Sequence, residues 1–69
     1  MDIFAERLKA LRKEHSMTLK QVSAALEIPL TTYANYAQGK RAPPIWFVVA
    51  VCNLFNVSAD YIVGRTNDY

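Results

Sequence analysis

A short internal stretch of the chain carries polar and basic side chains at a spacing that suits contacts with nucleic acid. Thr31, Thr32 and Asn35 recur within about one helical turn of one another. Asparagine can pair with adenine through two hydrogen bonds, and threonine can donate, accept or touch a thymine methyl. Lys40 and Arg41 follow closely, and cations there would attract a phosphate backbone. These residue types predict hydrogen bonds to base edges together with electrostatic contacts to phosphate.

Two helices separated by a tight turn have to position those side chains. The segment Thr18-Leu-Lys-Gln21 fits a capping box, in which the threonine hydroxyl accepts a backbone N–H and the glutamine reaches back. Pro29 disfavours helix in the residue before it and suits the start of the next helix. Gly39 is expected to end that helix in the left-handed conformation. The whole stretch of about 24 residues has the length of a helix-turn-helix and is too short for a βαβ unit.

Capping residues and apolar spacing predict three further helices. Asp2 caps a helix over about residues 3–14, with an apolar stripe at i, i+4 and i+7. Another helix over about residues 44–55 is apolar almost all round. Ser58 caps a short last helix that ends at Gly64. We therefore expect five helices in all.

The expected fold class is all-α, a compact five-helix domain with a central helix-turn-helix. The segment Val48-Val49-Ala50-Val51 has β-propensity, but the helical spacing of its apolar neighbours favours helix. The domain is expected to cover residues 1–66 and to leave residues 67–69 as a frayed C-terminal tail. The inner face of the second helix is expected to carry Val22, Ala25 and Leu26.

Composition sets the limits within which this fold must work. With 69 residues the chain makes one domain, and its 52% hydrophobic content excludes a disordered tail. The net charge of +2 permits a nucleic-acid partner without demanding one. The single cysteine, Cys52, cannot form an internal disulfide, which suits a reducing compartment. No apolar run reaches membrane-spanning length and no signal peptide is present, so we expect a cytoplasmic protein with no membrane partner.

Several short motifs together carry a family resemblance. They are Phe4-Ala-Glu-Arg-Leu8 with Leu11-Arg12-Lys13, Met17-Thr18, Tyr36-x-x-Gly39-Lys40-Arg41-x-Pro43 and Phe55-Asn-Val-Ser-x-Asp-Tyr-Ile-Val-Gly64-Arg-Thr66. With these motifs the chain resembles the Cro and phage-repressor (XRE-like) family of helix-turn-helix proteins over nearly its whole length. The resemblance implies sequence-specific DNA binding and transcriptional control. Members often bind as homodimers to two-fold symmetric operators.

The third helix, about residues 30–38, is expected to lie in the major groove of duplex DNA. The base-reading candidates are Leu30, Thr31, Thr32 and Asn35. The phosphate-contacting candidates are Thr18, Lys20, Lys40 and Arg41. The first two stand at a helix N-terminus, whose free N–H groups and partial positive charge favour anions. Thr18 also serves as a structural cap, and Asn35 remains open between a base reader and a solvated position.

Four residues depart from the family pattern. Leu19 stands where a glutamine is usual, and Leu30 stands where a polar or basic reader is common. Glu27 occupies a turn position that is usually glycine, where a positive φ strains other residues. Ala37 replaces a glutamate that pairs in the family with the arginine matching Arg12. Arg12 is then expected to turn to helix-end carbonyls or to solvent.

The apolar fourth helix predicts a homodimer interface. The interface candidates are Trp46, Phe47, Ala50 and Leu54, on the side opposite to Ile45, Val48, Val49, Val51, Cys52 and Phe55. Exposed aromatic side chains dominate interface energetics. Trp46 and Phe47 can alternatively cover the small core.

The function predicted from these features is a DNA-binding transcriptional regulator, a repressor acting as a homodimer on double-stranded DNA. The alternative is a protein-interaction module of the same fold, an antagonist or partner of another regulator with weak or no DNA binding. An enzyme is not expected, because the chain offers no nucleophile with a base, no paired carboxylates and no phosphate-cradling glycine loop. No cofactor, no metal and no small-molecule ligand is expected.

Overall fold

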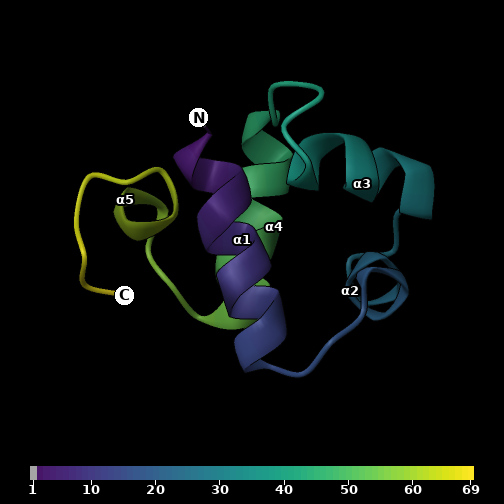
Figure 1. Ribbon diagram of the computed structural model, residues 1–69, viewed down its shortest axis with the longest axis horizontal. Coiled ribbons are helices and arrows are strands. Elements are labelled where there is room, and N and C mark those ends of the chain that lie inside the picture. The colour runs from purple at the N-terminus through teal and green to yellow at the C-terminus, as the bar shows by residue number, and fades with distance from the viewer. Residues whose placement is uncertain (1) are drawn as a thin grey trace.

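Five helices form the computed structural model, which describes residues 2–69. They are α1 (Ile3–Glu14), α2 (Leu19–Ala25), α3 (Leu30–Ala37), α4 (Ile45–Phe55) and α5 (Ala59–Ile62). In Figure 1, α1 crosses in front of α4, α2 and α3 lie on one side of this pair, and α5 lies on the other with the C-terminal segment. The all-α fold with a central helix-turn-helix predicted from the sequence is therefore confirmed, and residues 2–69 form no strand.

The predicted capping residues begin their helices as expected. Asp2 Oδ1 accepts the backbone N–H of Phe4 at 3.1 Å at the start of α1. At α2 both halves of the capping box are present: Gln21 N donates to Thr18 Oγ1 at 3.1 Å, and Thr18 N donates to Gln21 Oε1 at 2.8 Å. These short-range hydrogen bonds satisfy N–H groups that a helix start leaves unpaired.

The turn between α2 and α3 requires a left-handed residue, and that residue is Glu27. Its φ is +58°, in the region that glycine adopts without strain. Gly39, with φ +75°, ends α3 in the predicted left-handed conformation. Glutamate at the first of these positions therefore strains the helix-turn-helix.

The core is formed by one buried side of each helix and by Val57, which lies between α4 and α5. It consists of Phe4, Leu8, Leu11, Val22, Tyr33, Phe47, Val51, Phe55, Val57 and Ile62. At its centre lies Phe47, which is 0% exposed. The ring centroid of Phe47 lies 4.8 Å from that of Tyr36, 5.9 Å from that of Tyr33 and 6.1 Å from that of Phe4. This aromatic cluster joins α1, α3 and α4.

The position of Phe47 corrects the prediction that this residue belongs to a dimer interface. Phe47, Val51 and Phe55 recur at i, i+4 and i+8, and together they form the buried stripe of α4. The side that faces solvent carries Ile45, Trp46 and Val49, which are 79%, 51% and 51% exposed. The helix was predicted correctly, but its orientation about its own axis was not.

The inner face of α2 differs from the prediction at one residue. Val22 is buried and Leu26 packs against the core, but Ala25 is exposed and Ser23 is buried in its place. The Ser23 hydroxyl donates to the carbonyl oxygen of Lys20 at 2.9 Å, so its polar atom is satisfied within the helix. A small buried serine is therefore compatible with the core.

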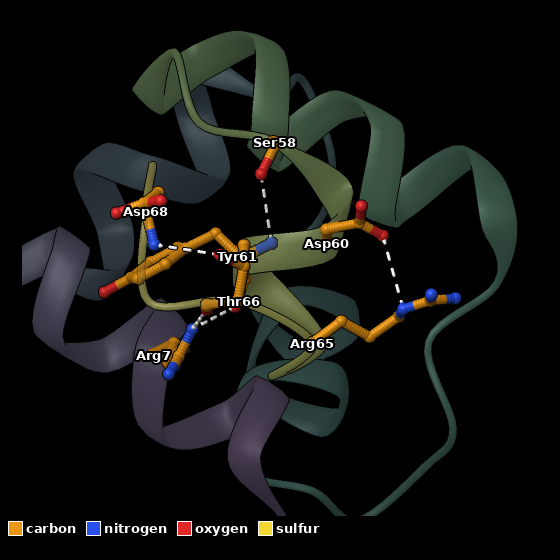
Figure 2. Close-up of polar contacts among 7 residues, drawn as sticks. All are labelled: Arg7, Ser58, Asp60, Tyr61, Arg65, Thr66 and Asp68. Carbon is orange, nitrogen blue, oxygen red and sulfur yellow. Dashed lines mark hydrogen bonds and ion pairs between the residues drawn. The ribbon is translucent and has the colours of Figure 1, made fainter.

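Arg7 of α1 connects the first helix to α5 and to the segment that follows it (Figure 2). Its guanidinium donates to the carbonyl oxygens of Tyr61 and Thr66 and to Asn67 Oδ1. The same group lies over the Tyr61 ring, 4.2 Å from its centroid, in a cation–π arrangement. Arg7 thereby holds the chain after α5 against α1.

The last residues have defined contacts with the rest of the fold. The Tyr69 hydroxyl donates to the Glu14 carboxylate at 2.8 Å, and the Tyr69 carbonyl oxygen accepts from Ser58 N. The domain boundary at residue 66 and the frayed tail at residues 67–69 stay predictions.

Candidate nucleic-acid interface

α3 has one side in the core and another facing solvent. Tyr33 is 0% exposed, whereas Leu30 is 45% exposed and Thr31 is exposed. No side chain caps the N-terminus of α3, because its N-cap residue is Pro29. The first N–H groups of α3 therefore have no intrahelical or side-chain partner, and such groups can donate to an anion.

The predicted base readers differ in how far they are exposed. Leu30 and Thr31 are exposed, while Thr32 and Asn35 are half-buried. Thr31 and Asn35 lie four residues apart, so they share the outward side of the helix. α3 contains no acidic or basic residue, so its own side chains neither attract nor repel phosphate.

The four predicted phosphate-contacting residues are all exposed, at two places on the surface. Lys40 and Arg41 follow the end of α3, where both backbone N–H groups donate to the carbonyl oxygen of Asn35, at 2.9 and 3.1 Å. Thr18 and Lys20 lie at the start of α2. The Thr18 oxygen accepts from Gln21 N, which leaves its O–H free to donate elsewhere.

Within residues 2–69, no acidic side chain forms an ion pair with Lys20, Lys40 or Arg41. The one ion pair within residues 2–69 joins Arg65 and Asp60, at 3.7 Å, next to α5 (Figure 2). Lys20, Lys40 and Arg41 therefore remain available for an anionic partner.

The structure shows which group the Arg12 side chain contacts when position 37 is an alanine. The Arg12 guanidinium donates to the carbonyl oxygen of Met17 at 2.8 Å, just beyond the end of α1. Arg12 therefore contacts a backbone carbonyl, but one in the connection between α1 and α2 rather than one of the helix-end carbonyls that were predicted. Leu19 is half-buried and packs against the core. A leucine at this position therefore adds apolar contacts.

Burial also raises the pKa values of two titratable groups, Tyr33 and Cys52. Burial raises the pKa of Tyr33, and the nearby positive charge of Arg12 partly offsets this rise. Burial likewise raises the pKa of the Cys52 thiol, which behaves as a small core residue. Within residues 2–69 no three His, Cys, Asp or Glu side chains come together as metal ligands.

Sequence reasoning missed the apolar surface around Ile45 and Val49, which it had assigned to the core side of α4. The predicted interface residues Trp46, Ala50 and Leu54 are partly exposed. The signal that could have located the outward side was the polar Asn53, which lies eight residues from Ile45 on the same exposed side.

Curated proteins that are similar to this chain are named as HTH-type transcriptional regulators. The chain is 35% identical to YobD of Bacillus subtilis (strain 168), which is described as an uncharacterized HTH-type transcriptional regulator. The match covers 66 residues, 96% of this chain and 59% of YobD. From the same organism, the HTH-type transcriptional regulators AnsR and ImmR are each 33% identical over 60 residues, 87% of this chain and 52% and 47% of theirs. The chain thus spans about half the length of the curated relatives that it matches.

No solved structure matches the chain. No helix within residues 2–69 has the length and apolar character needed to cross a membrane. The sequence model of the helix-turn-helix family HTH_3 matches residues 8–62, from the middle of α1 to the end of α5. The chain therefore belongs to the HTH_3 (XRE/Cro-like) helix-turn-helix family.

Proposed function

We propose that this chain binds duplex DNA sequence-specifically and acts as a transcriptional regulator, with α3 in the major groove. The observation that carries the proposal is the orientation of α3, which buries Tyr33 and exposes Leu30 and Thr31. A helix that is anchored on one side and solvent-facing on the other can enter a groove without unfolding the core. The matched Bacillus regulators carry transcriptional names, which supports the same function here.

The candidate base-reading residues of α3 make three kinds of contact in this proposal. The Asn35 amide pairs with adenine through two hydrogen bonds in the major groove. Thr31 and Thr32 donate to or accept from base edges, and Leu30 contacts a thymine methyl group. Specificity then rests on Asn35, because only its side chain offers a bidentate pairing.

Phosphate contacts flank the groove-reading helix on both sides. Lys40 and Arg41 reach the backbone from the end of α3, and Lys20 reaches it from the start of α2. The Thr18 hydroxyl donates to the same strand while its oxygen still accepts from Gln21 N. Each neutralised phosphate adds about one power to the salt dependence of binding.

We further propose a homodimer that forms through the solvent-facing side of α4. Ile45, Trp46 and Val49 expose large apolar areas there, with the half-buried Ala50 and Leu54 beside them. α4 has no charged residue, so two copies can meet without burying unpaired charge. Two-fold symmetry would place two α3 helices on the two halves of a symmetric operator. Repression would follow because a bound dimer occupies promoter DNA.

Selection from a random-duplex pool at about 50 mM salt tests DNA binding and half-site spacing together. Asn35→Ala should cost about 1–3 kcal/mol on the selected site and relax preference at one base pair. Lys40→Gln should weaken binding evenly across sequences and lower the salt slope by about one. Lys13→Gln, on the exposed end of α1, is the control with the same charge change. A pool with no bound duplex would refute the proposal and favour the protein-interaction module, whose apolar contact would be the exposed Leu30.

Sedimentation over a range of protein concentrations tests the dimer. The wild type should shift from monomer to dimer by high micromolar concentration, and Trp46→Ala should move this shift to higher concentration. Val63→Ala removes a similarly exposed apolar side chain that follows α5 and serves as the control. A wild type that stays monomeric throughout would end the dimer proposal.

A further inference from the structure

A pocket of about 240 Å³ lies between α1, α2 and α3, and the proposed DNA contacts do not use it. It is lined by Lys9, Arg12, Leu19, Tyr33, Ala37 and Gln38. The lining has two cationic side chains, two apolar ones and no acidic one. Its size is below that of a typical drug-sized ligand site, so it suits a ligand of few heavy atoms.

Tyr33 contributes a buried hydroxyl that has no hydrogen-bond partner within the described residues. The side chain is 0% exposed, and buried polar groups in folded proteins are nearly always paired. The charge of Arg12, which lines the same pocket, acts on the pKa of this hydroxyl. Tyr33 and Arg12 both line the pocket, so an acceptor bound there can satisfy this hydroxyl and pair with the guanidinium.

Arg12 has donors left for such an acceptor. Its one hydrogen bond within residues 2–69 goes to the carbonyl oxygen of Met17, and a guanidinium carries five N–H donors. Lys9 is exposed on the same helix, three residues earlier, and forms no ion pair within the described chain. The pocket therefore combines a positive potential with a fixed donor.

We propose that this pocket binds a small organic carboxylate. The carboxylate oxygens accept from the Arg12 guanidinium and the Tyr33 hydroxyl, and a short alkyl group contacts Leu19 and Ala37. The planar guanidinium fork matches a carboxylate in geometry. The apolar side chains favour an organic acid over a fully polar inorganic anion, because an alkyl group there leaves water. None of the residues that line this site is among the proposed DNA contacts.

NMR titration of the ¹⁵N-labelled protein with sodium acetate, propionate and butyrate, at constant ionic strength against sodium chloride, tests this proposal. We expect amide shifts confined to the pocket-lining residues. Affinity should rise roughly three- to fourfold for each added methylene, as expected for apolar burial. Shifts scattered over the surface, or the same shifts with chloride, would overturn the proposal. Sodium sulfate that binds as tightly as butyrate would do so too, since it lacks the alkyl group.

Variants identify the groups that hold the carboxylate. Tyr33→Phe removes only the hydroxyl and should weaken butyrate binding roughly tenfold, as expected for a hydrogen bond to a charged group. Lys9→Gln should weaken it roughly two- to fivefold, whereas Lys13→Gln, which carries the same charge change outside the pocket, should leave it unchanged. Unchanged affinity in Tyr33→Phe would overturn the proposal.

Ala37→Glu provides the sharpest test because it places a tethered carboxylate in the pocket. The new side chain should pair with Arg12 and abolish butyrate binding, since both compete for the same donors. Butyrate shifts that persist in a folded Ala37→Glu protein would overturn the site. If this variant fails to fold, Tyr33→Phe and the Lys9 and Lys13 pair still decide the matter.

Discussion

Phe47→Ala tests whether the Phe47 side chain is packed in the core, as the structure shows, or lies at a dimer interface. Phe47 is fully buried, and its ring lies within 6.1 Å, centroid to centroid, of four other aromatic rings. Truncation of a core phenylalanine to alanine costs about 3–5 kcal/mol through lost burial and the cavity that remains. A domain of this size has about 3–10 kcal/mol of stability in total. Phe47→Ala should therefore lose a large fraction of the total stability and unfold at a markedly lower urea concentration than the wild type.

The assay is urea denaturation followed by circular dichroism, at two protein concentrations. Ile45→Ala is the matched control, because it truncates an apolar residue of the same helix that is 79% exposed. This control should change the unfolding free energy by less than about 0.5 kcal/mol at low concentration. A milder variant, Phe47→Leu, keeps the protein folded and gives a measurable midpoint if Phe47→Ala does not.

Two results would refute this reasoning. A loss below about 1 kcal/mol for Phe47→Ala would mean that the residue is not part of a packed core. A loss that grows with protein concentration, and is matched by Ile45→Ala, would return Phe47 to a dimer interface, because interface residues contribute to stability by mass action.

Three other variants or measurements follow from the structure. Glu27→Gly should raise the free energy of unfolding by about 0.5–1 kcal/mol, since relief of left-handed strain exceeds the entropy cost of glycine. In the same melts Asn56→Gly, at φ +56°, should gain less, because asparagine tolerates this conformation. Arg7→Ala should cost about 2 kcal/mol in denaturation and expose the segment after α5 to proteolysis, whereas a similar loss in the exposed Lys13→Ala would contradict the role of Arg7. Because burial raises the pKa of Cys52, less thiolate is present at a given pH, so the midpoint of its alkylation rate should lie at higher pH in the folded protein than in urea; equal midpoints would argue against burial.

The features that the sequence predicted well depend on neighbours in the chain. The capping box at Thr18 and the left-handed stop at Gly39 each follow from the side chain and backbone of a few consecutive residues, whereas the left-handed turn at Glu27 was expected from the family resemblance. Such short-range rules do not require knowledge of what packs against the helix. The helix boundaries were predicted to within about two residues for the same reason.

The orientation of α4 could not be predicted in the same way. Ten of its eleven residues are apolar, and only Asn53 is polar, so the hydrophobic pattern has almost no contrast around the helix. The buried side is decided by shape, because the Phe47 ring fits among Phe4, Tyr33 and Tyr36. That complementarity joins residues up to 43 positions apart and is absent from any local pattern.

The pocket beside α3 arose from the same kind of long-range effect. Ala37 was recognised in the sequence as a lost partner for Arg12, but the unpaired Tyr33 hydroxyl appears only once α1 and α3 are packed together. Tyr33 and Ala37 line this pocket and belong to α3, so the carboxylate site and the proposed DNA-reading side share one helix. A bound carboxylate can alter DNA affinity only if it favours one placement of that helix. Any such coupling is reciprocal, so the fold-change that butyrate causes in DNA affinity must equal the fold-change that DNA causes in butyrate affinity.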